Sequence, residues 1–127
     1  MKQSFVEHVN LTVNNPSVLA ARLCVIFDWH IRWSGPALDD GTSIHVGTDE
    51  SYLAIYTHPK ISEQINRNHK VVANLNHIGI VVEDINAIEE KVKAAGYTPF
   101  SHRDYEPGER FYFLVEDGVE IEVVSYV

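Results

Sequence analysis

The sequence contains little cysteine, and that scarcity restricts its class. Its single cysteine, Cys24, cannot form an internal disulfide, which favours a reducing compartment. Cys24 lies within the apolar helical pattern of residues 18–27, so we interpret it as a buried small hydrophobe and not as a nucleophile.

Long apolar runs are absent as well. The stretch 18–27 is interrupted by Arg22 and is shorter than the roughly 20 residues that a membrane span needs. Near the start, Glu7, His8 and Asn10 would interrupt the apolar segment of a signal peptide. We therefore expect a cytoplasmic protein without a membrane span.

Basic residues are outnumbered by acidic ones, 10 to 18, and the formal net charge is −8. No stretch clusters Lys and Arg as a nucleic-acid-binding surface does, so we expect no nucleic-acid partner. The rest of the composition is that of a globular protein, because 45% of the 127 residues are apolar and 22% are charged. That length fits one domain with its own core.

A segment near the start recurs about half a chain later, which indicates an internal repeat. When His8 is placed on His77, the apolar residues of the two segments coincide: Val9 with Ile78, Leu11 with Ile80, Val13 with Val82 and Leu19 with Ile88. Each copy opens with the alternation of a half-buried strand. A helix follows in each, with Asn15 and Asp84 as N-caps, and Gly96 ends the second helix.

Three short strand-like runs follow each helix and are separated by turn residues. We predict them at residues 29–33, 42–46 and 52–57 in the first half and at 97–102, 110–115 and 119–125 in the second. The predicted fold class is therefore α+β, with two βαβββ modules forming a concave mixed sheet. We expect one domain over residues 1–127, with modules at 4–57 and 74–127 and a polar linker at 58–73.

Alternation also assigns side chains to the faces of the sheets. The apolar side of each first strand must meet the amphipathic helix, which leaves His8 and His77 on the concave side. The same alternation in the last strand directs Glu120 and Glu122 into the concavity. Histidines and carboxylates from distant parts of the sequence are thus predicted on one face.

Two imidazoles and one carboxylate on one side of an ion form the 2-His-1-carboxylate arrangement, which leaves positions open for substrate. We therefore predict a divalent metal on His8, His77 and Glu122. A single strand histidine has a simpler explanation, because a backbone carbonyl can satisfy it. The equivalent repeat positions favour the metal site. These ligands accept iron, manganese, nickel or zinc, so the sequence does not choose the metal.

The paired modules, with His in the first strand and an Ile-Glu-Val ending, resemble the vicinal oxygen chelate superfamily. That superfamily includes glyoxalases, bleomycin-resistance proteins, fosfomycin-resistance enzymes and extradiol dioxygenases. The resemblance covers nearly the whole chain, and its most specific stretches are residues 76–80 and 111–123. It implies the glyoxalase/bleomycin-resistance/dihydroxybiphenyl dioxygenase fold, a homodimer, and metal-ligand positions that map to His8, Ala54, His77 and Glu122.

Ala54 departs from that pattern. In glyoxalase I the fourth position is usually a glutamate that binds metal and moves protons, so Ala54 puts glyoxalase I activity in doubt. The remaining His8, His77 and Glu122 resemble the three-ligand set of extradiol dioxygenases and fosfomycin-resistance enzymes, and neither subfamily is favoured over the other.

The resemblance implies a metal-dependent enzyme acting on a small molecule with adjacent oxygens, as a lyase, isomerase, transferase or dioxygenase. The bound ion would act as a Lewis acid for the charge that develops on those oxygens. The catalytic candidates are Tyr112 and Arg110, which alternate on the strand beside Glu122, together with Glu120. Tyr112 could equally be a core residue and Arg110 a surface charge. Tyr52, Tyr56 and His45 are also predicted on the concave face.

Two other functions fit the same scaffold. A metal-free binding protein of the bleomycin-resistance type would use the concave face to sequester a ligand, and a net charge of −8 suits a cationic one. Such a protein has no need of the His8, His77 and Glu122 set. A regulatory domain is the third possibility, because a fold alone does not decide function.

Overall fold

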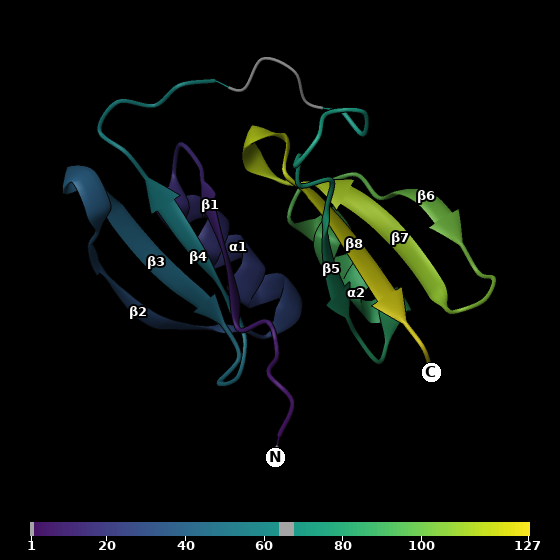
Figure 1. Ribbon diagram of the computed structural model, residues 1–127. Coiled ribbons are helices and arrows are strands. Elements are labelled where there is room, and N and C mark those ends of the chain that lie inside the picture. Colours follow the sequence, from purple (N-terminus) through teal and green to yellow (C-terminus); the bar gives the residue numbers. More distant parts are fainter. Residues whose placement is uncertain (1, 64–67) are drawn as a thin grey trace. The chain divides into compact units, whose positions relative to one another are not determined.

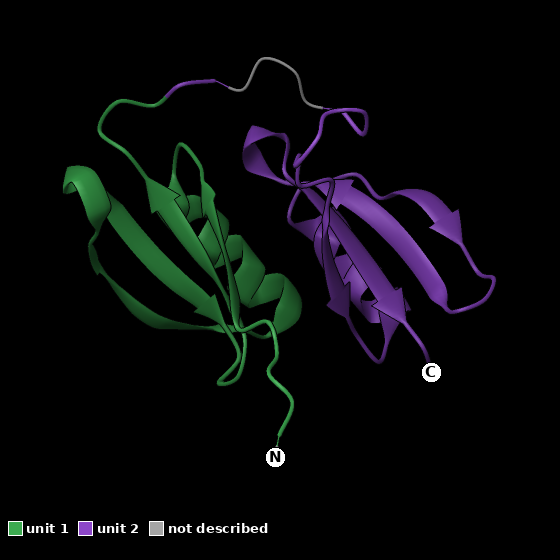
Figure 2. Cartoon of the chain, viewed as in Figure 1, with its two compact units in different colours: residues 1–61 green, residues 62–127 purple. Residues whose placement is uncertain are grey.

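The computed structural model describes residues 2–63 and 68–127, and the chain divides into two compact units (Figures 1 and 2). Unit 1 spans residues 1–61 and unit 2 spans residues 62–127. Each unit has a strand, a helix and three further strands, which confirms the α+β class and the two βαβββ modules. This division does not test the expectation of a single domain, which stays a prediction.

Each unit is built on one four-stranded mixed sheet, with its helix across one side (Figure 1). Unit 1 contains β1 (His8–Thr12), α1 (Pro16–Phe27), β2 (His30–Pro36), β3 (Thr42–Gly47) and β4 (Tyr52–Thr57). Unit 2 contains β5 (Ile78–Val81), α2 (Ile85–Ala94), β6 (Phe100–Arg103), β7 (Glu109–Leu114) and β8 (Glu120–Ser125). Two 3₁₀ turns, η1 (Leu38–Asp40) and η2 (Glu116–Gly118), complete the elements.

The two sheets have the same topology. The strand orders are β1-β4-β3-β2 and β5-β8-β7-β6, with the first strand parallel to the last and the other pairs antiparallel. The register is also repeated, because Asn10 lies opposite Ala54 and Gly79 lies opposite Glu122. Ala54 and Glu122 are therefore structurally equivalent positions of the two modules.

Both helices begin where the sequence predicts. The Asn15 side chain accepts a hydrogen bond from the backbone N–H of Val18 at 3.3 Å, and Asp84 accepts one from Ala87 at 3.1 Å. These caps satisfy N–H groups that the first helical turn leaves unpaired. After α2 the chain turns at Gly96, whose φ of 93° is a conformation that glycine adopts without steric cost.

Each helix buries its apolar side against its own sheet. In unit 1, Leu19 and Leu23 of α1 and Val46 and Ile55 of the sheet are almost fully buried. In unit 2, the largest fully buried side chains are aromatic and aliphatic: Phe111, Phe113, Ile121, Val92 and Val123. Because a strand alternates its side chains between faces, the residues between these core positions lie on the other side of the sheet.

Some local predictions are wrong. β2 covers His30–Pro36, where residues 29–33 were predicted, because its pairing with β3 continues along the sheet edge. β6 covers Phe100–Arg103 and not residues 97–102, since the Tyr97 hydroxyl is drawn to η2, where it donates to Glu116 at 2.5 Å. Cys24 is half-buried and not buried, although burial raises the pKa of its thiol. No helix among the described residues could span a bilayer.

Two neighbouring residues of β7 test this layering. Phe113 is completely buried on the α2 side, whereas Leu114 points the other way and is 49% exposed. We expect Phe113→Ala to lower the free energy of unfolding by about 3–5 kcal/mol, because it leaves a cavity in the core. Leu114→Ala should cost less than about 1 kcal/mol. Urea denaturation measures both, and equal losses would contradict the assigned faces.

Candidate functional site

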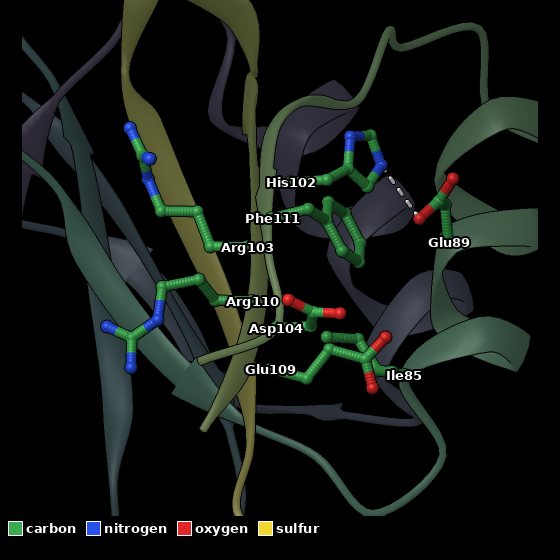
Figure 3. Close-up of a pocket in the computed structure, with 8 residues that line it drawn as sticks. All are labelled: Ile85, Glu89, His102, Arg103, Asp104, Glu109, Arg110 and Phe111. Atoms are coloured by element: carbon green, nitrogen blue, oxygen red, sulfur yellow. Dashed lines mark hydrogen bonds and ion pairs between the residues drawn. The ribbon is translucent and has the colours of Figure 1, made fainter. Parts of the chain in front are cut away.

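The open face of a sheet is defined here as the side that faces away from its helix. In unit 2 this face carries most of the predicted site residues, from β5, β7 and β8. Figure 3 shows the alternation directly, with Phe111 turned toward α2 and Arg110 turned away. The site residues on the open face of unit 2 are His77, Arg110, Tyr112, Glu120 and Glu122.

Two side chains of β7 hold the Glu122 carboxylate. Its Oε1 accepts a hydrogen bond from the Tyr112 hydroxyl at 2.6 Å and a longer one from Arg110 Nη1 at 3.4 Å. The other oxygen, Oε2, lies 3.5 Å from the point where a side chain would begin at Gly79. One carboxylate oxygen is therefore fixed by the protein, and the other lies over the bare backbone of β5.

Arg110 is itself fixed by the chain. Its Nε and Nη2 both donate to the Gly108 carbonyl at 3.5 Å, and its side chain is only 18% exposed. The hydrogen bond that Tyr112 donates to Glu122 raises the pKa of the Tyr112 phenol, and burial adds to the effect. Tyr112 is therefore a protonated donor at neutral pH, and Arg110 is a cation beside the same carboxylate.

His77 and Glu120 form a second contact on this face. His77 Nδ1 lies 3.7 Å from Glu120 Oε2, within the range of an ion pair and beyond that of a hydrogen bond. The His77 ring also meets the Tyr112 ring edge-on, with 5.6 Å between centroids. Four of the predicted residues are thus connected: His77 contacts Glu120 and Tyr112, and Tyr112 contacts Glu122.

The open face of unit 1 has a different chemistry. The Tyr52 ring stacks with His8 at 4.9 Å and with His45 at 4.7 Å, and His45 in turn contacts Trp33 at 5.0 Å. These four rings come from all four strands of the sheet. Arg32 lies 4.3 Å from the centre of the Tyr52 ring, a cation–π distance. This face is aromatic and imidazole-rich where unit 2 has carboxylates.

Ala54 places a methyl group where unit 2 has Glu122, and His45 is its direct cross-strand partner. Burial lowers the pKa of His45, and the nearby His8 and Arg32 lower it further. His45 is therefore neutral near pH 7 and available as a proton acceptor or a ligand. The sequence placed His45 on this face without assigning it a role.

Within either unit, the described residues contain no group of three His, Cys, Asp or Glu side chains close enough to hold a metal ion. Glu122 and His77 lie on the open face of unit 2, and His8 lies on that of unit 1, where its Nδ1 is 3.0 Å from Glu7 Oε1. Each predicted ligand is on the face that the alternation assigned to it. The complete three-ligand set stays a prediction.

Sequence reasoning missed two arginines, Arg32 and Arg103. Both follow an irregularity in an edge strand: the register shifts between Ile31 and Trp33 in β2, and between Phe100 and Arg103 in β6. A shift of this kind reverses the expected face of the residues beyond it. No pattern in the sequence marks these positions, so only the pairing of the strands reveals them.

A cavity of about 310 Å³ lies on the other side of the unit 2 sheet, next to α2 (Figure 3). His102 of β6 and Glu89 of α2 face one another across it, with 3.0 Å between Nε2 and Oε1. Arg110 contributes to the lining, but Figure 3 shows its guanidinium leaving the sheet on the opposite side. The cavity is therefore separate from the open-face residues.

Comparison with solved structures identifies the fold. A glyoxylase/bleomycin resistance protein/dioxygenase domain from Frankia sp. EAN1pec superposes with a TM-score of 0.80 at 19% identity, over 98% of both chains. The fosfomycin resistance protein FosX from Listeria monocytogenes gives 0.72 at 18% identity, over 98% of this chain and 94% of that one. A glyoxalase family protein from Enterococcus faecalis gives 0.76 at 13% identity, over 94% and 96%.

The chain therefore has the two-module fold of the vicinal oxygen chelate proteins, which confirms the resemblance seen in the sequence. No protein-family model matches the sequence, and no curated protein does so either. At these identities the likeness defines the fold, and the activity has to be argued from the site.

The hydrogen bond between Tyr112 and Glu122 gives a pH-dependent prediction. The folded state raises the pKa of Tyr112 above its unfolded value of about 10, so its contribution to stability is complete below that pH. It is lost as the pH rises through the folded-state pKa. We expect Tyr112→Phe to be about 1–2 kcal/mol less stable than the wild type at pH 7, with the difference shrinking above about pH 10.

Urea denaturation between pH 7 and 11.5 measures this difference. Tyr105→Phe is the matched control, because Tyr105 is 60% exposed, and it should change stability little at any pH. A wild-type advantage over Tyr112→Phe that stays constant into the alkaline range would show that the phenol proton is not involved.

Proposed function

We propose that this protein is a divalent-metal-dependent enzyme that acts on a small molecule with two adjacent oxygen atoms. One observation carries the proposal: Glu122 has one oxygen fixed by Tyr112 and Arg110, while the other is directed over Gly79, on the same face as His77. A carboxylate held at one oxygen is oriented in advance for a ligand at the other.

The proposed metal ligands are His77 and Glu122 of unit 2 and His8 of unit 1, from this chain or from a second copy. The donor set suits a divalent ion, because two imidazoles and one carboxylate accept iron, manganese, nickel or zinc and leave positions open. His8 and His77 are both accessible, with side-chain exposures of 46% and 38%. When bound, the ion supplies Lewis-acid stabilisation to the substrate oxygens.

The other side chains of the open face have roles in this proposal. Tyr112 orients Glu122 through its hydroxyl, and its raised pKa keeps that proton in place at neutral pH. Arg110 supplies positive charge for an anionic part of the substrate. Glu120, beside His77, is the proposed proton acceptor. These roles fit an addition, an isomerisation or an elimination on a small oxygenated molecule, and also ring opening by a dioxygenase.

Solved relatives of the fold support a metal. The Listeria monocytogenes FosX has been crystallised with Mn(II) and 1S,2S-dihydroxypropylphosphonic acid, and also with Mn(II) and a sulfate ion. The first of these ligands has two adjacent hydroxyl groups. By analogy, manganese is the first metal to test here. The homodimer and the cytoplasmic location expected from the sequence stay predictions.

Metal analysis tests the proposal directly. The protein is stripped with a chelator, reloaded with Mn(II), Fe(II), Ni(II) or Zn(II), desalted and analysed by mass spectrometry of the elements. We expect about one ion per chain for the wild type with at least one of these metals. His77→Ala and Glu122→Gln should each lower the affinity by about 100-fold or more, because each removes a proposed ligand.

His69→Ala is the matched control. His69 is an exposed histidine outside the strands, so its removal should leave the stoichiometry unchanged. Circular dichroism of each variant separates loss of ligand from loss of fold. A wild type that retains none of the four metals, or a control that loses metal as readily as His77→Ala, would favour the metal-free binding protein instead.

A further inference from the structure

Two arginines of unit 2 lie directly opposite one another on the open face. Arg103 of β6 and Arg110 of β7 are register partners, and Figure 3 shows both side chains leaving the sheet on the side away from the cavity. Directly opposite residues of an antiparallel pair have Cβ atoms about 5 Å apart, and like charges there destabilise the sheet. Such a pair needs a compensating partner.

A local irregularity puts Arg103 on this face. Phe100 pairs with Tyr112 and Arg103 pairs with Arg110, so three steps along β6 match two along β7. In a regular strand, an odd number of steps would turn Arg103 toward α2. The extra residue is accommodated near Ser101, whose φ of 55° is unfavourable for a serine. The backbone thus departs from its preferred geometry in a way that directs Arg103 to the open face.

Charges of opposite sign are separated across the sheet at this point. Asp104 and Glu109, the neighbours of the two arginines, turn toward the cavity beside α2, where Glu89 also lies (Figure 3). The open face keeps the guanidinium groups. In a chain whose net charge is −8, this leaves a local cationic surface that the nearest carboxylates do not cover.

The one carboxylate in contact with the pair does not satisfy both cations. Glu122 meets Arg110 at 3.4 Å, well beyond the roughly 2.8 Å of a strong charge-assisted hydrogen bond. Arg103 is exposed and has no ion pair among the residues that the structure describes. By count, Arg110 also keeps one N–H free on each terminal nitrogen after its bonds to Gly108 and Glu122.

We infer that Arg103 and Arg110 form a binding site for a tetrahedral oxyanion group, of the phosphate or phosphonate class, on a small-molecule ligand. A carboxylate offers two oxygens and one charge, which suits a single guanidinium fork. A phosphate offers three oxygens and a charge of about −1.5 to −2 at pH 7, which suits two forks. The inference names a substrate class for the proposed function, and rests on that function only for the fate of the bound molecule.

Calorimetric titration of the full chain with inorganic phosphate tests the site. The protein is first stripped with a chelator, and the ionic strength is kept constant with chloride. We expect saturable binding by the wild type, weaker by about tenfold or more in Arg103→Gln, which removes one fork. Arg103→Lys, which keeps the charge without the fork, should fall between the two. Acetate should bind more weakly than phosphate.

Lys91→Gln is the matched control, because it removes the same charge from an exposed position on α2 of the same unit. Its phosphate affinity should stay within about twofold of the wild type. The inference is overturned if the wild type does not bind phosphate, or if Arg103→Gln and Lys91→Gln weaken binding equally. It is also overturned if phosphate binds only after metal is restored and Arg103→Gln leaves that binding unchanged.

Metal content separates this inference from the proposed function. Arg103 contacts none of the proposed metal ligands among the described residues, so Arg103→Gln should bind metal with the stoichiometry of the wild type. Phosphate binding without any metal binding would support the arginine site and refute the metalloenzyme. Metal binding without phosphate binding would do the reverse.

Discussion

The covering of one side of each sheet by its helix is the constraint on which every other feature depends. Because side chains alternate along a strand, burying Phe111 and Phe113 against α2 directs Arg110 and Tyr112 to the opposite side. The same rule in β8 brings Glu122 to that side. The hydrophobic core therefore positions the polar residues, and the free energy that orients the site comes mainly from apolar burial.

Glu122 is where structural and chemical demands meet. A half-buried carboxylate loses hydration, and the hydroxyl of Tyr112 and the guanidinium of Arg110 replace part of it. The same contacts limit what the carboxylate can do next, because Oε1 is engaged and only Oε2 is directed over Gly79. The adjacent cation also weakens the field that a metal would feel. Affinity for a dication and affinity for an oxyanion are therefore balanced against each other on this face.

The two modules share a topology but have diverged in chemistry. The equivalent positions of Ala54 and Glu122 show this, since one presents a methyl group and the other a carboxylate. Next to Ala54, unit 1 has the imidazole of His45, whose pKa burial lowers. An aromatic surface in one module and a charged surface in the other suit a ligand with unlike ends, and the shared backbone explains how both arose from one pattern.

The sequence by itself determined the module plan, both helix starts and the face of each regular strand position, because hydrophobic period and capping are local properties. His8, His77, Tyr112 and Glu122 all lie on the faces that alternation assigned. Only the tertiary structure decided which donors hold Glu122 and where Arg103 points. Those outcomes depend on cross-strand register and on one extra residue in β6, which arise from pairing between segments and have no signature in either segment alone.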